Sequence, residues 1–132
     1  MLFPGDLEKA GWKTLLQYQE FRQELNKVTI LVASHHGREN GYCEDMFEYC
    51  KPALVVISDK QKIYETQETY SQYSLRVSGC QTVDGEQRKI MSTRKDGHIY
   101  LEVRPHYLYN EMWWYVSSDT IKRKMNFASM RV

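Results

Sequence analysis

Two short apolar runs, residues 28–33 and 53–58, constrain the fold of this 132-residue chain more than any other feature. Both are rich in valine, isoleucine and leucine, and neither alternates with polar residues, which is typical of a strand covered on both faces. The segment between them ends at Pro52 and carries apolar side chains at helical spacing, so it predicts a short helix. These side chains belong to Cys43, Met46, Phe47 and Cys50. Strand, helix and strand in this order predict a parallel βαβ unit and an α/β protein.

Helices are also predicted on both sides of this unit. Pro4 and Gly5 prevent an earlier start, and Asp6 stands where an N-cap belongs. Apolar residues then recur at helical spacing with a shift midway, so we expect a bent helix over residues 7–26. A further helix is expected over residues 66–75.

The segment from residue 80 to residue 104 has the character of a β-hairpin region. Its expected strands are residues 80–83, 88–93 and 99–103, separated by the turns Asp84-Gly85 and Asp96-Gly97. The remaining residues contain Trp113, Trp114 and a basic cluster, but no clear period. The sequence therefore divides into a domain over residues 1–104 and an aromatic and basic tail over residues 105–132.

Composition limits the possible partners and the setting. The 18 basic and 17 acidic residues give a net charge of +1, which offers no global field for a polyanion. The longest apolar run, residues 54–57, is too short to span a bilayer, so no membrane association is expected. The start of the chain does not resemble a signal peptide. Cys43, Cys50 and Cys80 are odd in number and lack C-x-x-C spacing, which favours free thiols in the cytoplasm.

The residues best suited to chemistry follow the first apolar run. His35 and His36 lie directly after it, and loops after the carboxyl ends of buried strands often bind ligands in α/β sheets. Imidazole and the carboxylate of Asp6 are both good ligands for a divalent ion. The simpler alternatives are that the histidines are solvated or bond to the backbone, and that Asp6 caps a helix.

Three segments in this order resemble a known family. They are the Phe3-Pro4-Gly5-Asp6-Leu7-Glu8 segment, the Leu31-Val32-Ala33-Ser34-His35-His36-Gly37 segment, and residues 51–59. Together they resemble the C-terminal half of metallo-β-lactamase-fold hydrolases, with the ComEC-like branch, related to the nuclease of DNA-uptake competence, the most similar. The resemblance covers about residues 2–104. It implies half of a βα/αβ sandwich, with a mixed sheet, flanking helices and a C-terminal β-hairpin section.

The resemblance also implies roles for particular residues. Asp6 would bridge two metal ions, zinc or manganese, and His36 would be the last histidine ligand, with His35 as the alternative. The metal ions of this family activate water, commonly to hydrolyse phosphodiesters. The side chains expected to touch substrate or to support the ligands are Arg38, Ser34 and Tyr64.

The family's His-x-His-x-Asp-His motif, which supplies most of the metal ligands, is absent from this sequence. One aspartate and two histidines are too few for a two-metal site, so we expect the chain to be inactive alone. The expected function is therefore the C-terminal portion of a metal-dependent phosphodiesterase acting on nucleic acid or nucleotides. It would be completed by the missing N-terminal half of the fold or by a second copy of the chain. The alternative is a non-catalytic interaction or structural module that retains the half-fold.

Overall fold

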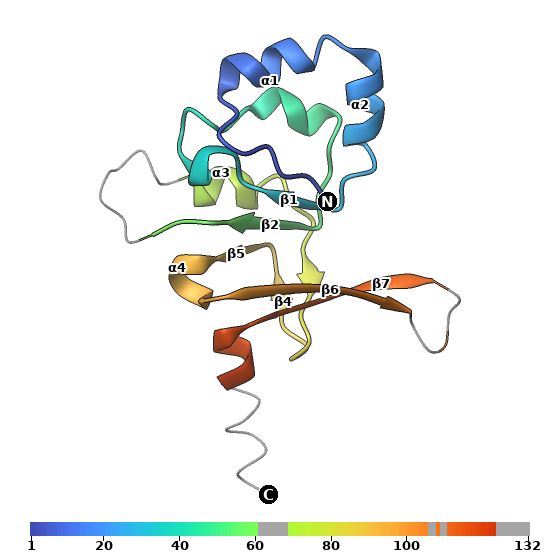
Figure 1. Ribbon diagram of the computed structural model, residues 1–132, viewed down its shortest axis with the longest axis vertical. Coiled ribbons are helices and arrows are strands. Elements are labelled where there is room, and N and C mark those ends of the chain that lie inside the picture. The colour runs from blue at the N-terminus through green and yellow to red at the C-terminus, as the bar shows by residue number, and fades with distance from the viewer. Residues whose placement is uncertain (61–68, 106–107, 109–110, 124–132) are drawn as a thin grey trace, which may run out of the picture.

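The computed structural model describes residues 1–60, 69–105, 108 and 111–123, and shows a mixed α/β fold (Figure 1). Residues 119–123 form a final helical turn. In chain order the other elements are α1 (Lys9–Leu15), α2 (Gln19–Leu25), β1 (Ile30–Val32), η1 (Ser34–Gly37), η2 (Glu44–Glu48), β2 (Leu54–Ile57), α3 (Tyr70–Ser74), β3 (Cys80–Gln81), β4 (Gln87–Arg88), β5 (Ile90–Ser92), α4 (Thr93–Asp96), β6 (Ile99–Pro105) and β7 (Met112–Ser118).

A parallel sheet with the order β1-β2-β5 forms the centre of the fold. Leu2 extends it by a parallel bridge to Leu31, so a fourth segment runs in the same direction. The sequence prediction of two buried, parallel strands is confirmed. Because all these segments are parallel, their carboxyl ends meet at one edge, on the left of Figure 1 where α4 lies.

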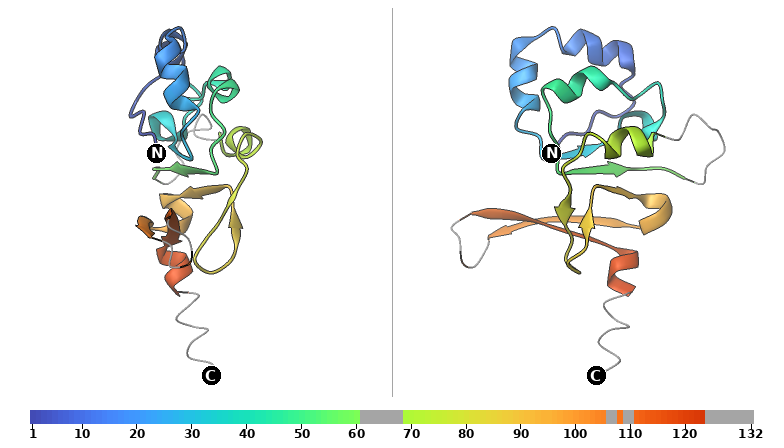
Figure 2. Two further views of the ribbon diagram at one scale, coloured as in Figure 1. Left: turned by 90° about the vertical axis from the view of Figure 1, so that its right-hand side faces the viewer. Right: turned by 180° about the vertical axis from the view of Figure 1, so that it is seen from behind.

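Both faces of this sheet are covered, as the lack of alternation predicted. One face packs against the helices through Leu31, Val55 and Ile90, which share a core with Trp12 and Tyr73. The residues on the opposite face pack against the C-terminal hairpin and the last helical turn; they are Ile30, Leu54, Val56 and Met91. Figure 2 shows the resulting layers edge-on, with the helices above the sheet and the β6–β7 hairpin below it.

The arrangement after residue 87 differs from the sequence prediction. The expected hairpin between residues 88–93 and 99–103 is wrong, because β5 joins the parallel sheet instead. The expected Asp96-Gly97 turn is the end of α4, which begins where the Ser92 hydroxyl accepts a hydrogen bond from the Lys95 N–H. β6 pairs with β7, which lies in the segment that has no clear period in sequence. The Asp84-Gly85 turn between β3 and β4 is confirmed.

The helices are shorter than their sequence patterns suggest. The single bent helix expected over residues 7–26 is two helices, α1 and α2, separated where Tyr18 adopts an extended backbone. The helix expected from the apolar spacing of Cys43, Met46, Phe47 and Cys50 is the short 3₁₀ helix η2. Of the helix expected over residues 66–75, residues 70–74 form α3, and 66–68 lie outside the described residues. No helix in the described part of the chain is long and apolar enough to cross a membrane.

Candidate functional site

Four segments leave the carboxyl edge of the parallel sheet, and each carries polar side chains. Asp6 follows the Leu2 bridge, His35 and His36 follow β1, Asp59 follows β2, and Arg94 follows β5. Ligands of open α/β sheets bind at this edge, because loops there converge from neighbouring strands. This edge is therefore the expected place for a ligand site.

Asp6 and His36, which the family resemblance placed in one site, lie close together at this edge. Asp6 Oδ1 lies 3.7 Å from His36 Nε2, and the two side chains are 75% and 55% exposed. Asp6 does not cap a helix, because α1 begins at Lys9 with Glu8 in the N-cap position. The carboxylate of Asp6 is therefore not engaged by a helix terminus.

The hydrogen bonding of His36 defines which ring nitrogen faces Asp6. Nδ1 lies 2.8 Å from the carbonyl oxygen of Ser58, and because a carbonyl only accepts, Nδ1 must carry the hydrogen. In the neutral ring, Nε2 then presents its lone pair to the Asp6 carboxylate. Two acceptors face each other at 3.7 Å, an arrangement that a cation or a proton between them would stabilise. A shallow cavity lined by Phe3, Gly5, Val32, Ala33 and Ser58 surrounds this pair.

The backbone that carries the histidines is strained. His35 and His36 have φ values of +48° and +56°, in the left-handed region that residues with a side chain rarely adopt. Interactions on both sides hold this conformation: the His35 N–H donates to the Gly5 carbonyl at 2.9 Å, and the Thr69 hydroxyl donates to the Gly37 carbonyl. Such strain persists only where the surroundings impose it, and it is common at functional sites. No pattern in the sequence revealed it.

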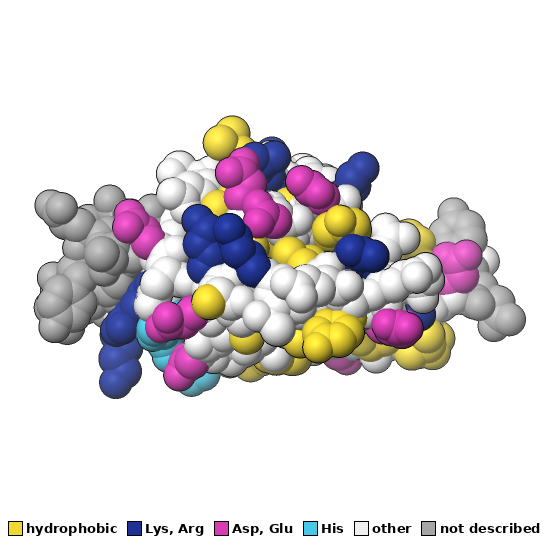
Figure 3. Space-filling view, turned by 90° about the horizontal axis from the view of Figure 1, so that it is seen from above, with side chains coloured by type: hydrophobic (Ala, Val, Ile, Leu, Met, Phe, Trp, Pro, Cys, Tyr) yellow, Lys and Arg dark blue, Asp and Glu magenta, His cyan; other side chains and the backbone are white. Residues whose placement is uncertain are grey.

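His35 lies beside a different carboxylate from His36, and its Nδ1 is buried with no hydrogen-bond partner among the described residues. Its Nδ1 lies 3.4 Å from Glu8 Oε1, and Glu8 also accepts a hydrogen bond from the Asn40 side chain at 2.8 Å. The two imidazole rings are 6.5 Å apart between centroids. Sequence reasoning placed Glu8 only at the start of a helix, so this second pair was missed. Seen from the helical side, histidine side chains lie beside acidic ones at the edge of the face (Figure 3).

The three residues expected near the substrate or supporting the ligands have different positions. Ser34 is buried, and its hydroxyl donates to the Leu7 carbonyl, so it joins η1 to the segment that follows Asp6. Arg38 is partly buried, and its Nε has no hydrogen-bond partner among the described residues. Tyr64 lies outside the described residues.

Two residues with the chemistry of metal ligands, Asp6 and His36, lie close to each other at this edge. Within residues 1–60, 69–105, 108 and 111–123, no group of three or more histidine, cysteine, aspartate and glutamate side chains is arranged to hold a metal ion. Asp6 and His36 have the chemistry of metal ligands, but the described residues do not complete their set.

The cysteines do not contribute to this edge. All three are free, and Cys43 and Cys50 are buried in the core, which confirms their expected packing role. Burial raises the pKa of the Cys50 thiol to about 11, so it is protonated at neutral pH.

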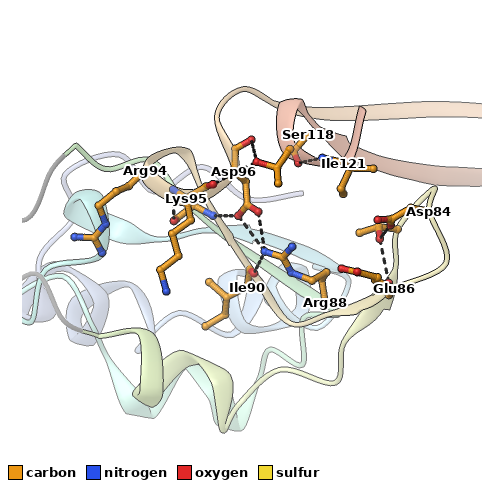
Figure 4. Close-up of polar contacts among 12 residues, drawn as sticks. Asp84, Glu86, Arg88, Ile90, Arg94, Lys95, Asp96, Ser118 and Ile121 are labelled. Carbon is orange, nitrogen blue, oxygen red and sulfur yellow. Dashed lines mark hydrogen bonds and ion pairs between the residues drawn. The ribbon is translucent and has the colours of Figure 1, made fainter. Parts of the chain in front are cut away.

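Two arginine–aspartate pairs organise the end of β5, and Figure 4 shows the first of them, Arg88 with Asp96. Arg88 binds both carboxylate oxygens of the buried Asp96, at 2.9 and 3.0 Å, and the Ser92 N–H donates to the same carboxylate. Arg94 pairs with Asp59 at 3.2 Å. In Figure 4 the side chains of Arg94 and Lys95 point away from the Arg88–Asp96 pair. The first pair is internal, whereas the second lines a cavity.

Comparison with known proteins adds no relative: no protein-family model, curated protein or solved structure matches this chain.

Proposed function

We propose that this chain is the C-terminal portion of a metal-dependent hydrolase of the metallo-β-lactamase-like, ComEC-like type, and that Asp6 and His36 hold its divalent metal ion, zinc or manganese. The substrate class is a phosphodiester of nucleic acid or a nucleotide. The observation that carries the proposal is the approach of Asp6 Oδ1 to His36 Nε2 at 3.7 Å.

The surroundings of His36 support a ligand role. Histidines that bind metals usually donate their other ring N–H to a carbonyl or carboxylate, which fixes the ring and its tautomer. The Ser58 carbonyl takes this part for His36. A strained backbone that directs the ring toward Asp6 is also easier to explain by function than by stability.

The remaining residues of the edge would act on the substrate or on the ligands. A divalent ion bound here would supply Lewis-acid activation of water and of a phosphoryl oxygen. His35, which lies beside Glu8, and Arg38, whose buried Nε has no hydrogen-bond partner in the described part of the chain, are the side chains we assign to an anionic substrate. Ser34 supports the site indirectly, because its hydroxyl ties η1 to Leu7.

Two protein ligands are fewer than the roughly three that a catalytic ion needs, so we propose that other ligands come from outside the described residues. The N-terminal half of such a fold, or a second copy of this chain, would supply them. We expect no hydrolysis of a generic phosphodiester by the chain alone, and activity when a half that carries the missing histidines is added. The three free cysteines favour a reducing compartment such as the cytoplasm.

Metal titration tests the ligand assignment directly. Isothermal titration of the purified chain with Zn²⁺ and with Mn²⁺ is expected to show binding that Asp6→Asn and His36→Gln each weaken by more than about 10-fold, since even the partners of metal ligands are worth roughly 10–100-fold. His98→Gln is the matched control, because His98 also faces a carboxylate, that of Asp119 at 2.8 Å. Absence of stoichiometric binding, or equal binding by the wild type and both variants, would refute the assignment.

A non-catalytic interaction module is the second candidate, and the β6–β7 hairpin favours it. Val103, Leu108, Met112 and Trp113 are exposed apolar residues on or next to this hairpin. Val103 and Met112 lie on the same face of the hairpin, because Val103 pairs with Trp114 and Met112 with Pro105, and contiguous exposed apolar residues commonly mark protein interfaces. Light scattering on the wild type and on Met112→Ser tests this candidate. Association that the substitution abolishes, in a chain that binds no metal, would favour it over the hydrolase.

A further inference from the structure

A second cavity lies at the same sheet edge, between the ends of β2 and β5 and the start of α3. Its volume is about 480 Å³, within the range typical of small-molecule sites. Asp59, Arg94, Lys95, Tyr70 and Ser71 contribute to its lining. None of these residues belongs to the Asp6–His36 pair.

Arg94 is held in place on one side of this cavity. The side chain of Asp59 is only 2% exposed; it forms an ion pair with the guanidinium of Arg94 at 3.2 Å and accepts a hydrogen bond from the Arg94 backbone N–H at 3.4 Å. Thr93 strengthens the connection, because its hydroxyl accepts from the Asp59 N–H at 2.9 Å and donates to the Asp59 carbonyl at 2.7 Å. A guanidinium has more donors than one carboxylate engages, so Arg94 retains donors for a ligand.

Lys95 gives the cavity an excess of positive charge. Its ammonium lies 4.9 Å from the centre of the Tyr70 ring, and it makes no ion pair with any described carboxylate. With Asp59 neutralised by Arg94, the local balance of these three side chains is one positive charge. Arg88, by contrast, is paired with the buried Asp96 and does not line this cavity.

The chemistry of this lining fits a phosphate that carries a base. A guanidinium fixed by a carboxylate and a nearby ammonium are typical phosphate ligands, and the Ser71 hydroxyl is a further donor. The Tyr70 side chain is exposed at the cavity wall, and its ring offers a face on which a base can stack. Inorganic phosphate would use the cations without the ring.

We propose that this cavity binds the phosphate group of a nucleotide, with Arg94 and Lys95 on the phosphate and Tyr70 under the base. The inference rests on the proposed function in one respect: a phosphodiester substrate would bring a phosphate group to this edge. Binding of the nucleotide in this cavity needs no metal ion. Ser58 connects this cavity with the Asp6–His36 pair, because its carbonyl accepts a hydrogen bond from His36 and it directly precedes Asp59 in the chain.

The test is titration of the full chain with AMP, adenosine and inorganic phosphate in the presence of EDTA, followed by calorimetry or NMR. We expect AMP to bind at least about 10-fold more tightly than adenosine, the amount that one charge-assisted hydrogen bond is typically worth. We also expect AMP to bind more tightly than inorganic phosphate, because only AMP can use the ring of Tyr70.

Variants separate this cavity from general charge attraction. Lys95→Gln should weaken AMP binding by about 10-fold, whereas Lys51→Gln makes the same charge change at the amino end of β2 and should leave binding unchanged. Arg94→Lys keeps the charge beside Asp59 but loses the planar donor pair, so it should also weaken binding. Tyr70→Leu should weaken AMP binding and leave phosphate binding unchanged.

The outcomes of this test and of the metal titration are independent. AMP binding should persist in Asp6→Asn and His36→Gln, whether or not those variants lose metal. Equal binding of AMP and adenosine, equal binding by the wild type and Lys95→Gln, or loss of AMP binding in Asp6→Asn would overturn the proposal.

Discussion

Replacing His36 by glycine and by alanine measures how much strain the candidate site stores. Both variants lose the imidazole and its hydrogen bond to the Ser58 carbonyl, so they differ only in the Cβ atom. The backbone of His36 has φ +56°, and a left-handed conformation costs a residue with a side chain about 1–2 kcal/mol. Glycine escapes this cost but loses more freedom on folding, about 0.5–1 kcal/mol. We therefore expect His36→Gly to be more stable than His36→Ala by about 1 kcal/mol.

The matched control is Gln23, an exposed residue inside α2. There the order should reverse, because glycine in a helix interior is about 1 kcal/mol less favourable than alanine. The contrast between the two positions is then about 2 kcal/mol. Urea unfolding followed by circular dichroism resolves a difference of this size. Glycine less stable than alanine at both positions would refute the reasoning, since it would mean that the His36 backbone is not left-handed in solution.

A stable His36→Gly variant that no longer binds metal would give the strain a functional meaning. The chain would then hold an unfavourable backbone in order to place one imidazole opposite Asp6, as strained functional sites do.

Three further predictions concern the support of this edge and the core. Asp96→Ala removes the carboxylate that binds Arg88 and should lower the free energy of unfolding by about 3 kcal/mol, because it leaves a partly buried charge without its partner. In thermal unfolding, the double variant that also carries Arg88→Met should regain part of this stability. A double variant no more stable than Asp96→Ala would contradict the prediction. Hydrogen bonds from His98 lower the pKa of Asp119 to about 2, from an ordinary value of 3.8, so the stability that this carboxylate contributes is complete above about pH 4 and is lost as the pH falls toward 2. Acid unfolding of Asp119→Asn should accordingly depend less on pH in this range than that of the wild type, and identical profiles would count against the assignment. Because burial raises the pKa of Cys50 to about 11, iodoacetamide at pH 8 should modify it only on unfolding, and rapid labelling of the folded chain, detected by mass spectrometry, would show that the thiol is accessible.

Several features of the fold were predictable from local patterns alone. The two apolar runs defined β1 and β2 and their burial on both faces, because a strand with no polar face must be covered twice. The place of His35 and His36 after the first of these strands was also predictable, whereas the parallel Leu2 bridge that brings Asp6 to the same edge was not. The hairpin after residue 87 was wrong for a physical reason: a short run such as Ile90–Ser92 is compatible with either pairing, and the choice depends on the whole sheet.

The sequence by itself therefore determined an α/β chain with a parallel centre and with two imidazoles at its carboxyl edge. The tertiary structure decided which histidine faces Asp6, paired His35 with Glu8, and gave both histidines their left-handed backbone. It also joined Asp59 to Arg94, residues that no local pattern connects. The physical reason is the range of the interactions. Hydrophobic periodicity is a local property of the chain, whereas the orientation of the His36 ring depends on the Ser58 carbonyl, which directly follows β2.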